Sequence, residues 1–241
     1  SATDVGIYDQ ALKIINILLT LVTTLGSVML PRVASLIAEG DHKAVNKMYE
    51  ISFLIYNLVI FPMIAGILIV KNDFVSFFFG LDFQNARYAI AIMVFRMFFV
   101  GWTNIIGVQI LIAHNKHREF MLSTTIPAFV SVALNLLLIP PFGYIGASIV
   151  AVLTEVLGWC FEMYFAREYL REVSILPAML KIIVASLVMY GALNLLQIVL
   201  HFSPTLNVLI YSGAGGLIYA GLILALRVVN ISELKATLVK N

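Results

Sequence analysis

The segment ISFLIYNLVIFPMIAGILIV, residues 51–70, runs for twenty positions without a charged side chain. An α-helix rises about 1.5 Å per residue, so this segment as a helix would cross the roughly 30 Å hydrocarbon layer of a bilayer. A helix on the surface of a soluble protein would instead carry a charged face toward water. The segment therefore predicts a transmembrane helix.

The rest of the sequence has the same apolar character. Of its 241 residues, 61% are hydrophobic and 12% are charged, whereas soluble domains average about 45–50% apolar and about 25% charged residues. The net charge of +2 comes without a basic stripe, so we expect no nucleic-acid partner. Cys160 is the single cysteine, which rules out a disulfide framework. The composition predicts an integral membrane protein.

Six more apolar stretches are separated by joints that are polar or rich in Gly and Pro. They predict an all-α membrane region over residues 1–241, with about seven transmembrane helices. The predicted spans are residues 5–30, 51–70, 85–112, 120–139, 144–166, 178–200 and 206–228. The joints between them include residues 31–50 and 140–143.

Lysine and arginine are distributed unevenly among these joints. Eleven belong to the joints after the first, third and fifth spans and to the C-terminal tail, whereas the opposite side holds Lys71 and Arg87. Because cytoplasmic joints are enriched in cations, we expect the N-terminus outside and the C-terminus in the cytoplasm. An outside start without a signal peptide leads us to expect the C-terminal part of a longer protein, with the N-terminal lobe absent.

The first predicted span carries a line of polar side chains. They are Asp9, Lys13, Asn16, Thr20, Thr24 and Ser27. Steps of three and four residues place them on one helix face, which makes Asp9, Lys13 and Asn16 candidate substrate-binding residues beside a polar cavity. Two alternatives remain open: the threonines can hydrogen-bond within packed helices, and Asp9 with Lys13 can form an exposed i,i+4 ion pair.

Arg96 is the strongest single signal of function. It lies about eleven residues into its span, near the midplane, where a charge is costly and usually faces a partner or a pathway. Glu155 has a similar depth in the fifth span, so the two are predicted to pair across the interior. Either this is a structural salt bridge, or Arg96 engages an anionic substrate while Glu155 tunes it or carries a proton. Glu162 continues the Glu155 face nearer the cytoplasmic edge.

Sequence motifs for covalent chemistry do not stand out. His114, His117 and Glu119 resemble half of a metal-binding box, but His42 and His201 are isolated, so we interpret the three as part of a basic cytoplasmic turn and predict no metal site. The sequence has no Gly-rich phosphate loop, no paired catalytic carboxylates and no nucleophile with a plausible base. We therefore expect no catalytic residues and no enzymatic activity.

Three stretches resemble a known family. VGIYDQALKI (5–14), VMLPRVASLIAEGD (28–41) and LNLLLIPPFGYIGASIVAVLTE (134–155) look like parts of the C-terminal half of bacterial polysaccharide repeat-unit flippases. These are the Wzx-type members of the MOP superfamily, which is MATE-like and includes multidrug and lipid II exporters. The third stretch is the most specific, with an Asn inside a span, an Ile-Pro step, and Gly-x-x-Gly-Ala opening the next span.

The resemblance implies the C-terminal lobe of a two-lobe transporter that moves an undecaprenyl-diphosphate-linked oligosaccharide across the bacterial cytoplasmic membrane by alternating access. It implies a role in capsule, O-antigen or exopolysaccharide assembly, with membrane lipids, polysaccharide polymerase and glycosyltransferases as further partners. No cofactor is expected, and coupling to an H⁺ or Na⁺ gradient is left open. Pro141 departs from the pattern, because relatives often carry a basic residue there.

Two other functions remain open. A multidrug or organic-cation exporter of the same superfamily would favour acidic cavity residues over Arg96. A seven-helix receptor or sensor shares the topology, although a retinal-type sensor needs a lysine midway along its last span, and residues 206–228 contain none.

Overall fold

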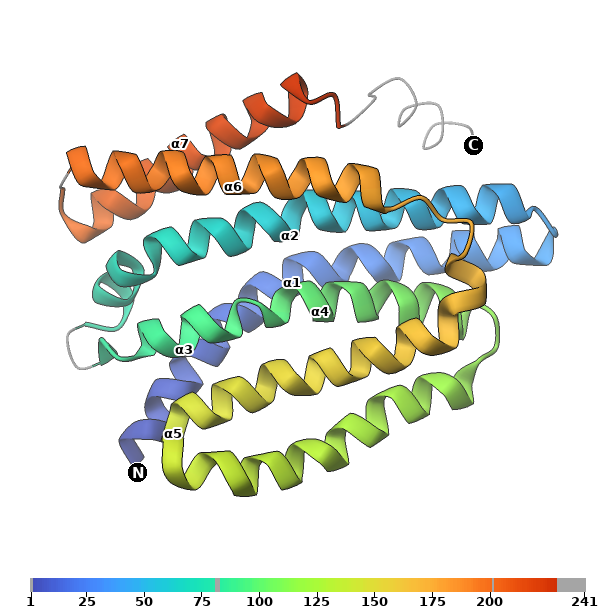
Figure 1. The fold of residues 1–241 in the computed structure, drawn as a ribbon, viewed down its shortest axis with the longest axis horizontal. Helices are drawn as coiled ribbons and strands as arrows, with labels where there is room; N and C mark the ends of the chain where they lie inside the picture. Colours follow the sequence, from blue (N-terminus) through green and yellow to red (C-terminus); the bar gives the residue numbers. More distant parts are fainter. Residues whose placement is uncertain (1, 81–82, 201, 229–241) are drawn as a thin grey trace.

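The computed structural model describes residues 2–80, 83–200 and 202–228, without the side chains of residues 2, 21, 22 and 24–28. All regular structure in these ranges is helical (Figure 1), which confirms the predicted all-α class. The elements are α1 Ala2–Ala38, α2 His42–Phe78, α3 Ala86–Met93, α4 Arg96–Thr103, the π-helix η2 Asn104–Ile112, α5 His117–Leu170, α6 Leu176–Val199 and α7 Pro204–Ala225.

Each of the seven predicted spans coincides with helix to within a few residues. In the described part of the chain, five helical stretches are long and apolar enough to cross a membrane: α2, α3 through η2, α5, α6 and α7. α1 adds a shorter apolar stretch, Met29–Ala38. α5 counts once among the five, although its 54 residues far exceed the roughly 20 that a bilayer requires.

α5 reverses its direction at Gly143, where the backbone is non-helical with φ 54° and ψ −131°. Glycine suits this position because a positive φ strains residues that carry a Cβ. A Cβ here would also lie 3.3 Å from the carboxylate of Asp4. The first arm of α5 (117–142) and its second arm (144–170) lie side by side at the bottom of Figure 1. The predicted joint at 140–143 is thus reduced to a single non-helical residue.

The predicted joint at 31–50 is also much shorter in the structure. α1 continues through Pro31 to Ala38, and α2 begins at His42, so only residues 39–41 separate the two helices. Asp41 caps α2, because its carboxylate accepts a hydrogen bond of 3.0 Å from the Ala44 backbone N–H. Most of the polar residues of this predicted joint therefore lie within α1 and α2 and not in a loop.

The third predicted span is interrupted twice. A turn at residues 94–95 separates α3 from α4, and α4 then continues directly into the π-helix η2. π-helical segments are rare and often occur at functional sites. As a result, Arg96 stands at the first position of α4, immediately after the turn.

The core lies between α1, α2, the segment from α3 to η2, and the C-terminal end of α5. Three hydrogen bonds between buried or half-buried side chains join α2 to α4 and η2. They are Ser52 to Gln109 at 2.7 Å, Trp102 to Asn57 at 3.0 Å and Tyr56 to Asn104 at 2.8 Å. Because an unpaired polar group is costly in apolar surroundings, these bonds hold α2 in register with its neighbours.

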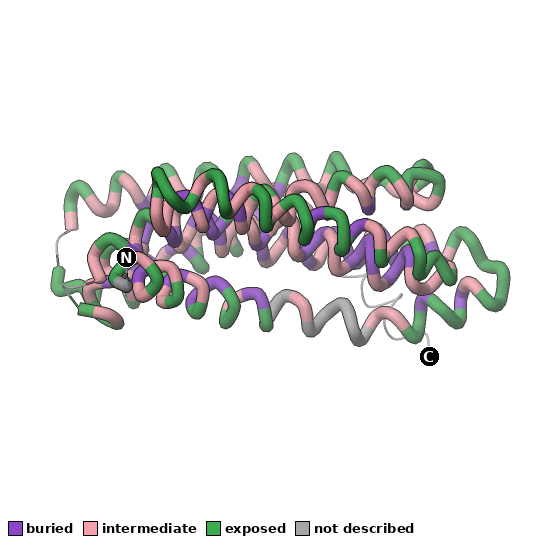
Figure 2. Tube along the Cα trace, turned by 90° about the horizontal axis from the view of Figure 1, so that it is seen from below, coloured by how far each residue is buried: buried purple, intermediate pink, exposed green. Residues whose placement is uncertain are grey.

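The outer surface is largely apolar. Leu136 on α5, Leu195 on α6 and Leu217 on α7 are 73%, 67% and 78% exposed, and Figure 2 shows exposed residues along the outward faces of the bundle. A soluble monomer rarely presents continuous apolar surface of this extent. The structure is that of a multi-pass membrane protein.

The joints fall into two groups at opposite ends of the bundle. The turns at residues 39–41, 113–116 and 171–175 lie at the right-hand end of Figure 1, whereas the N-terminal end of α1 and the reversal between the two arms of α5 lie at the left-hand end. The joints predicted after the first, third and fifth spans therefore share one end, and most of their cations lie in the helices beside these short turns.

Candidate functional site

A cavity of about 370 Å³ lies between α1, α4 and the two arms of α5. Its size is within the range of ligand-binding pockets, roughly 300–1,000 Å³. Its polar lining residues are Tyr8, Asn16, Arg96, Ser131, Asn135, Thr154 and Glu155, and the remaining lining is aliphatic. Two segments that are far apart in the sequence, the first predicted span (5–30) and the stretch 134–155, both contribute residues to the lining of this cavity.

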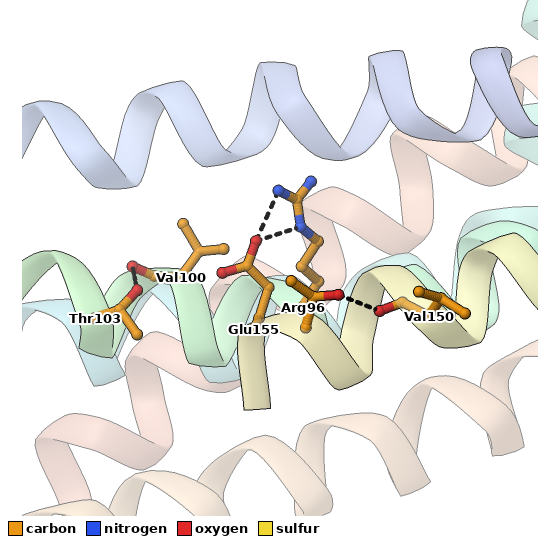
Figure 3. Close-up of polar contacts among 6 residues, drawn as sticks. Arg96, Val100, Thr103, Val150 and Glu155 are labelled. Carbon is orange, nitrogen blue, oxygen red and sulfur yellow. Dashed lines mark hydrogen bonds and ion pairs between the residues drawn. The ribbon is translucent and has the colours of Figure 1, made fainter. Parts of the chain in front are cut away.

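Arg96 and Glu155 form an ion pair at the wall of this cavity, as the sequence predicts. Arg96 Nη2 lies 2.8 Å from Glu155 Oε1, and Arg96 Nε donates to the same oxygen at 2.9 Å. Both side chains are 23% exposed. Figure 3 shows the guanidinium and the carboxylate projecting from α4 and α5 toward α1. The pair is thus partly desolvated but open to the cavity.

The geometry of the pair leaves room for a ligand. A guanidinium has five N–H donors and a carboxylate has two acceptor oxygens, whereas the two contacts here converge on one oxygen, Glu155 Oε1. Charge-assisted hydrogen bonds of this kind are strong, and a phosphate can replace the carboxylate through two parallel bonds to a guanidinium. The arrangement can therefore exchange an internal anion for an external one.

Other polar groups complete the cavity wall. Asn16, predicted from the line on the first span, lines the cavity from α1. Tyr8 and Asn135, which the sequence did not assign to the site, line it too. The hydroxyls of Ser131 and Thr154 donate to carbonyls of their own helix at 2.7 and 2.8 Å. Tyr8 and Asn135 both lie in stretches that carry the family resemblance, which is the signal that could have found them.

Asp9 and Lys13 are not part of the cavity lining. Their side chains pair with each other at 2.8 Å and are 52% and 58% exposed, respectively. This geometry corresponds to the exposed i,i+4 alternative. Further along the same line, Thr20 donates to the Asn16 carbonyl at 2.9 Å. The side chains of Thr24 and Ser27 lie outside the described residues.

Glu162 lies on the same arm as Glu155 but in different surroundings. It is 2% exposed, and Ser123 Oγ lies 3.4 Å from its Oε1. Ser123 itself donates more closely to the Phe120 carbonyl, at 2.7 Å. The sequence placed Glu162 near an edge of the bilayer and gave it less weight, so its burial is a feature that sequence reasoning missed.

A second hollow of about 280 Å³ lies at the end of the bundle that carries the turns 39–41 and 171–175, where His42, His114 and Tyr169 contribute to its lining. Burial lowers the pKa of His114 below the ordinary value of 6.5, and the charges of His42 and Lys116 act in the same direction, although a backbone hydrogen bond opposes them. His114 is therefore neutral near pH 7, and its ring packs on Tyr169 with 3.9 Å between centroids. This hollow is separate from the Arg96 cavity.

Long apolar helices that line an open cavity with polar groups, and place an ion pair in its wall, are typical of a membrane transporter. The chain belongs to the lipid II flippase MurJ family, whose model matches residues 3–213. A solved structure of the lipid II flippase MurJ in an inward closed conformation has the same fold, with a TM-score of 0.77 over 91% of this chain and 15% sequence identity. The resemblance to this exporter superfamily is confirmed.

Relatives of this chain occur in archaea and bacteria. An uncharacterized membrane protein, MJ1068, of Methanocaldococcus jannaschii is 26% identical over 94% of this chain. The probable low-salt glycan biosynthesis flippase Agl15 of Haloferax volcanii is 22% identical over 68% of the chain, and a putative O-antigen transporter of Escherichia coli is 25% identical over 69%. The matches cover 44%, 35% and 40% of these relatives, so the chain spans less than half their length.

Proposed function

We propose that this chain forms one lobe of a flippase that moves an undecaprenyl-diphosphate-linked oligosaccharide repeat unit across the cytoplasmic membrane by alternating access. The Arg96–Glu155 pair at the cavity wall, in a chain of the MurJ family, carries the proposal. The diphosphate is anionic, and a guanidinium suits it better than the point charge of a lysine does. The sugar needs a polar path, while the polyprenyl chain can stay in lipid.

In this mechanism Glu155 and the diphosphate compete for Arg96. Without cargo, Glu155 keeps the guanidinium compensated, which avoids the cost of an unpaired charge in a low-dielectric site. Cargo binding transfers Arg96 to the diphosphate, and the return of Glu155 favours release on the other side. Asn16 and Tyr8 on α1 and Asn135 on the first arm of α5 offer further hydrogen bonds to the cargo.

A second lobe is part of the proposal, because alternating access needs two bodies that move relative to each other. Its support is that this chain spans less than half the length of the curated relatives it matches. We further propose that the end of the bundle with the turns 39–41, 113–116 and 171–175 faces the cytoplasm, since cation-rich joints favour that side.

The function is tested in liposomes that contain the two-lobe transporter and the lipid-linked oligosaccharide in both leaflets. An external glycosidase cleaves cargo that is in the outer leaflet, and the cleaved fraction is followed over time. We expect the cleaved fraction to rise toward completion with the wild-type transporter, and to stop at the share initially in the outer leaflet with the 241-residue chain alone. Transport of organic cations without cargo movement would instead support the multidrug exporter, and flipping by this chain alone would contradict the second lobe.

The orientation is tested by labelling with an impermeant thiol reagent in intact cells. Cys160 is exposed, so it is first replaced by serine. Asn115→Cys and Phe142→Cys then place one thiol at each end of the bundle. We expect labelling at residue 142 and none at residue 115 until the cells are opened. The reverse pattern would overturn the proposed orientation.

A further inference from the structure

Glu162 is an acidic side chain in the interior that the proposed cargo site does not use. It is 2% exposed, and among the described residues its Oε2 has no hydrogen-bond partner. Its other oxygen, Oε1, faces the Ser123 hydroxyl and the backbone of Gly107 in η2. A Cβ on Gly107 would lie 2.8 Å from this oxygen. The absence of a side chain at residue 107 is therefore what allows the carboxyl to sit against η2.

No cation neutralises Glu162 in the described part of the structure. The sequence of η2, NIIGVQILI, has no titratable side chain. On the first arm of α5, Ser123 and Phe120 face it, and the acid of that arm, Glu119, pairs with Lys116 at 3.5 Å. On its own arm, Glu155 is the charged group that acts on it, and Glu155 is held by Arg96. An isolated buried carboxylate costs several kcal/mol, so the carboxyl is neutral in this conformation.

We propose that Glu162 is a proton-binding site of the transporter, occupied in this conformation and emptied when η2 and the two arms of α5 separate. Opening admits water to the carboxyl, whose O–H bond then breaks, and the proton leaves to water while a hydrated carboxylate remains. Closing again requires that a proton be taken up. This inference rests on the proposed function, because it assigns the coupling ion of that same cycle.

The proton and the cargo are linked through Glu155. When cargo takes Arg96 away, the negative charge of Glu155 becomes uncompensated, two helical turns from Glu162 on the same face. Uncompensated negative charge favours the protonated form of a neighbouring acid. Cargo binding therefore strengthens proton binding at Glu162, and by reciprocity the proton strengthens cargo binding.

The inference is tested on the purified 241-residue chain in lipid nanodiscs by infrared spectroscopy across pH. The signal is the C=O stretching band of a protonated carboxyl. We expect this band to persist at pH 7 in the wild type and to be lost in Glu162→Gln. Glu168→Gln is the matched control, because Glu168 is an exposed acid on the same arm, and it should leave the band unchanged. A wild-type chain without the band at pH 7, or an unchanged band in Glu162→Gln, would overturn the inference.

Three further measurements keep the result decisive. If Glu162→Gln yields no folded protein, Glu162→Asp serves instead, and the band should move to another wavenumber. Arg96→Gln should raise the pH at which the band disappears, because it leaves Glu155 uncompensated; an unchanged midpoint would refute the link. Replacing K⁺ by Na⁺ should not affect the band, and its loss in Na⁺ would show a sodium site instead of a proton site.

The same experiment separates this inference from the proposed function. The infrared band requires no cargo and no second lobe, so its absence refutes proton binding while the flippase proposal stands. In the two-lobe transporter, Glu162→Gln should flip cargo at a rate that no longer depends on pH. A protonated Glu162 in a transporter that never moves the cargo would refute the proposed function and leave the proton site intact.

Discussion

Glu155 and Glu162 lie on the same arm of α5, and they show how different surroundings give the same type of side chain different properties. Glu155 is 23% exposed, faces a cavity and holds Arg96 at 2.8 Å. Glu162, two helical turns further on, is 2% exposed and faces η2, and no described cation pairs with it. The first can remain charged because its partner is charged, whereas the second can be buried only when it is neutral. This contrast in surroundings is the basis for proposing anion exchange at the first site and proton exchange at the second.

The largest expected effect comes from removing the cation of the first site. Arg96→Ala should reduce flipping by about 100-fold or more, because two charge-assisted contacts to the diphosphate, worth together about 3 kcal/mol, are lost. Arg96→Lys keeps the charge but not the parallel geometry, so it should retain part of the activity. The measurement is the initial flipping rate divided by the amount of folded transporter. A rate within twofold of wild type in Arg96→Ala would contradict the anion-exchange role.

A smaller effect is expected from crowding the second site. Gly107→Ala would bring a Cβ to 2.5 Å from the Phe120 ring and 2.8 Å from Glu162 Oε1. Overpacking of this kind costs typically about 1–3 kcal/mol, which should lower the thermal unfolding midpoint of the chain in nanodiscs. Gly191→Ala on α6 is the matched control, because nothing lies within 4 Å of its added Cβ. Equal midpoints for the two variants would mean that η2 does not hold Glu162 closely.

The smallest effect is expected at the exposed ion pair of α1. Asp9→Asn or Lys13→Gln removes a pair whose side chains are 52% and 58% exposed, and such pairs contribute roughly 0.2–1 kcal/mol at most. Both variants should therefore unfold and flip cargo almost as the wild type does. A loss of flipping comparable to that of Arg96→Ala would contradict this expectation and indicate that Asp9 and Lys13 bind the substrate.

The depth of a side chain along its transmembrane helix could be predicted from the sequence. Equal depths led to the prediction that Arg96 and Glu155 form a pair. Both residues lie about the same number of positions into their predicted spans, and the structure brings them together at 2.8 Å. Rotation about the helix axis could not be predicted in the same way. Asp9, Lys13 and Asn16 follow one line on α1, but only Asn16 reaches the cavity. Which edge of a polar face meets a neighbour depends on packing against other helices.

The breaks in helical structure were predicted only in part. The joint at 140–143 was recognised from its prolines and glycine, and the reversal does occur at Gly143. The turn at 94–95 and the π-helix η2 were not, because this stretch contains no proline and keeps the apolar composition of a continuous transmembrane helix. Those irregularities place Arg96 at the start of α4 and Gly107 against Glu162. The burial of Glu162 could not be predicted because its depth alone puts it near an edge of the bilayer.

The central claim is that Arg96 binds the anionic cargo and does not merely stabilise Glu155. The most direct test is the flipping rate per folded transporter in the double variant Arg96→Gln, Glu155→Gln. Two neutral amides leave no uncompensated charge, so the folded amount should match the wild type. We expect this correctly folded variant to have lost flipping, because the diphosphate no longer has its guanidinium. A flipping rate equal to that of the wild type would contradict the claim and reduce the pair to a structural salt bridge.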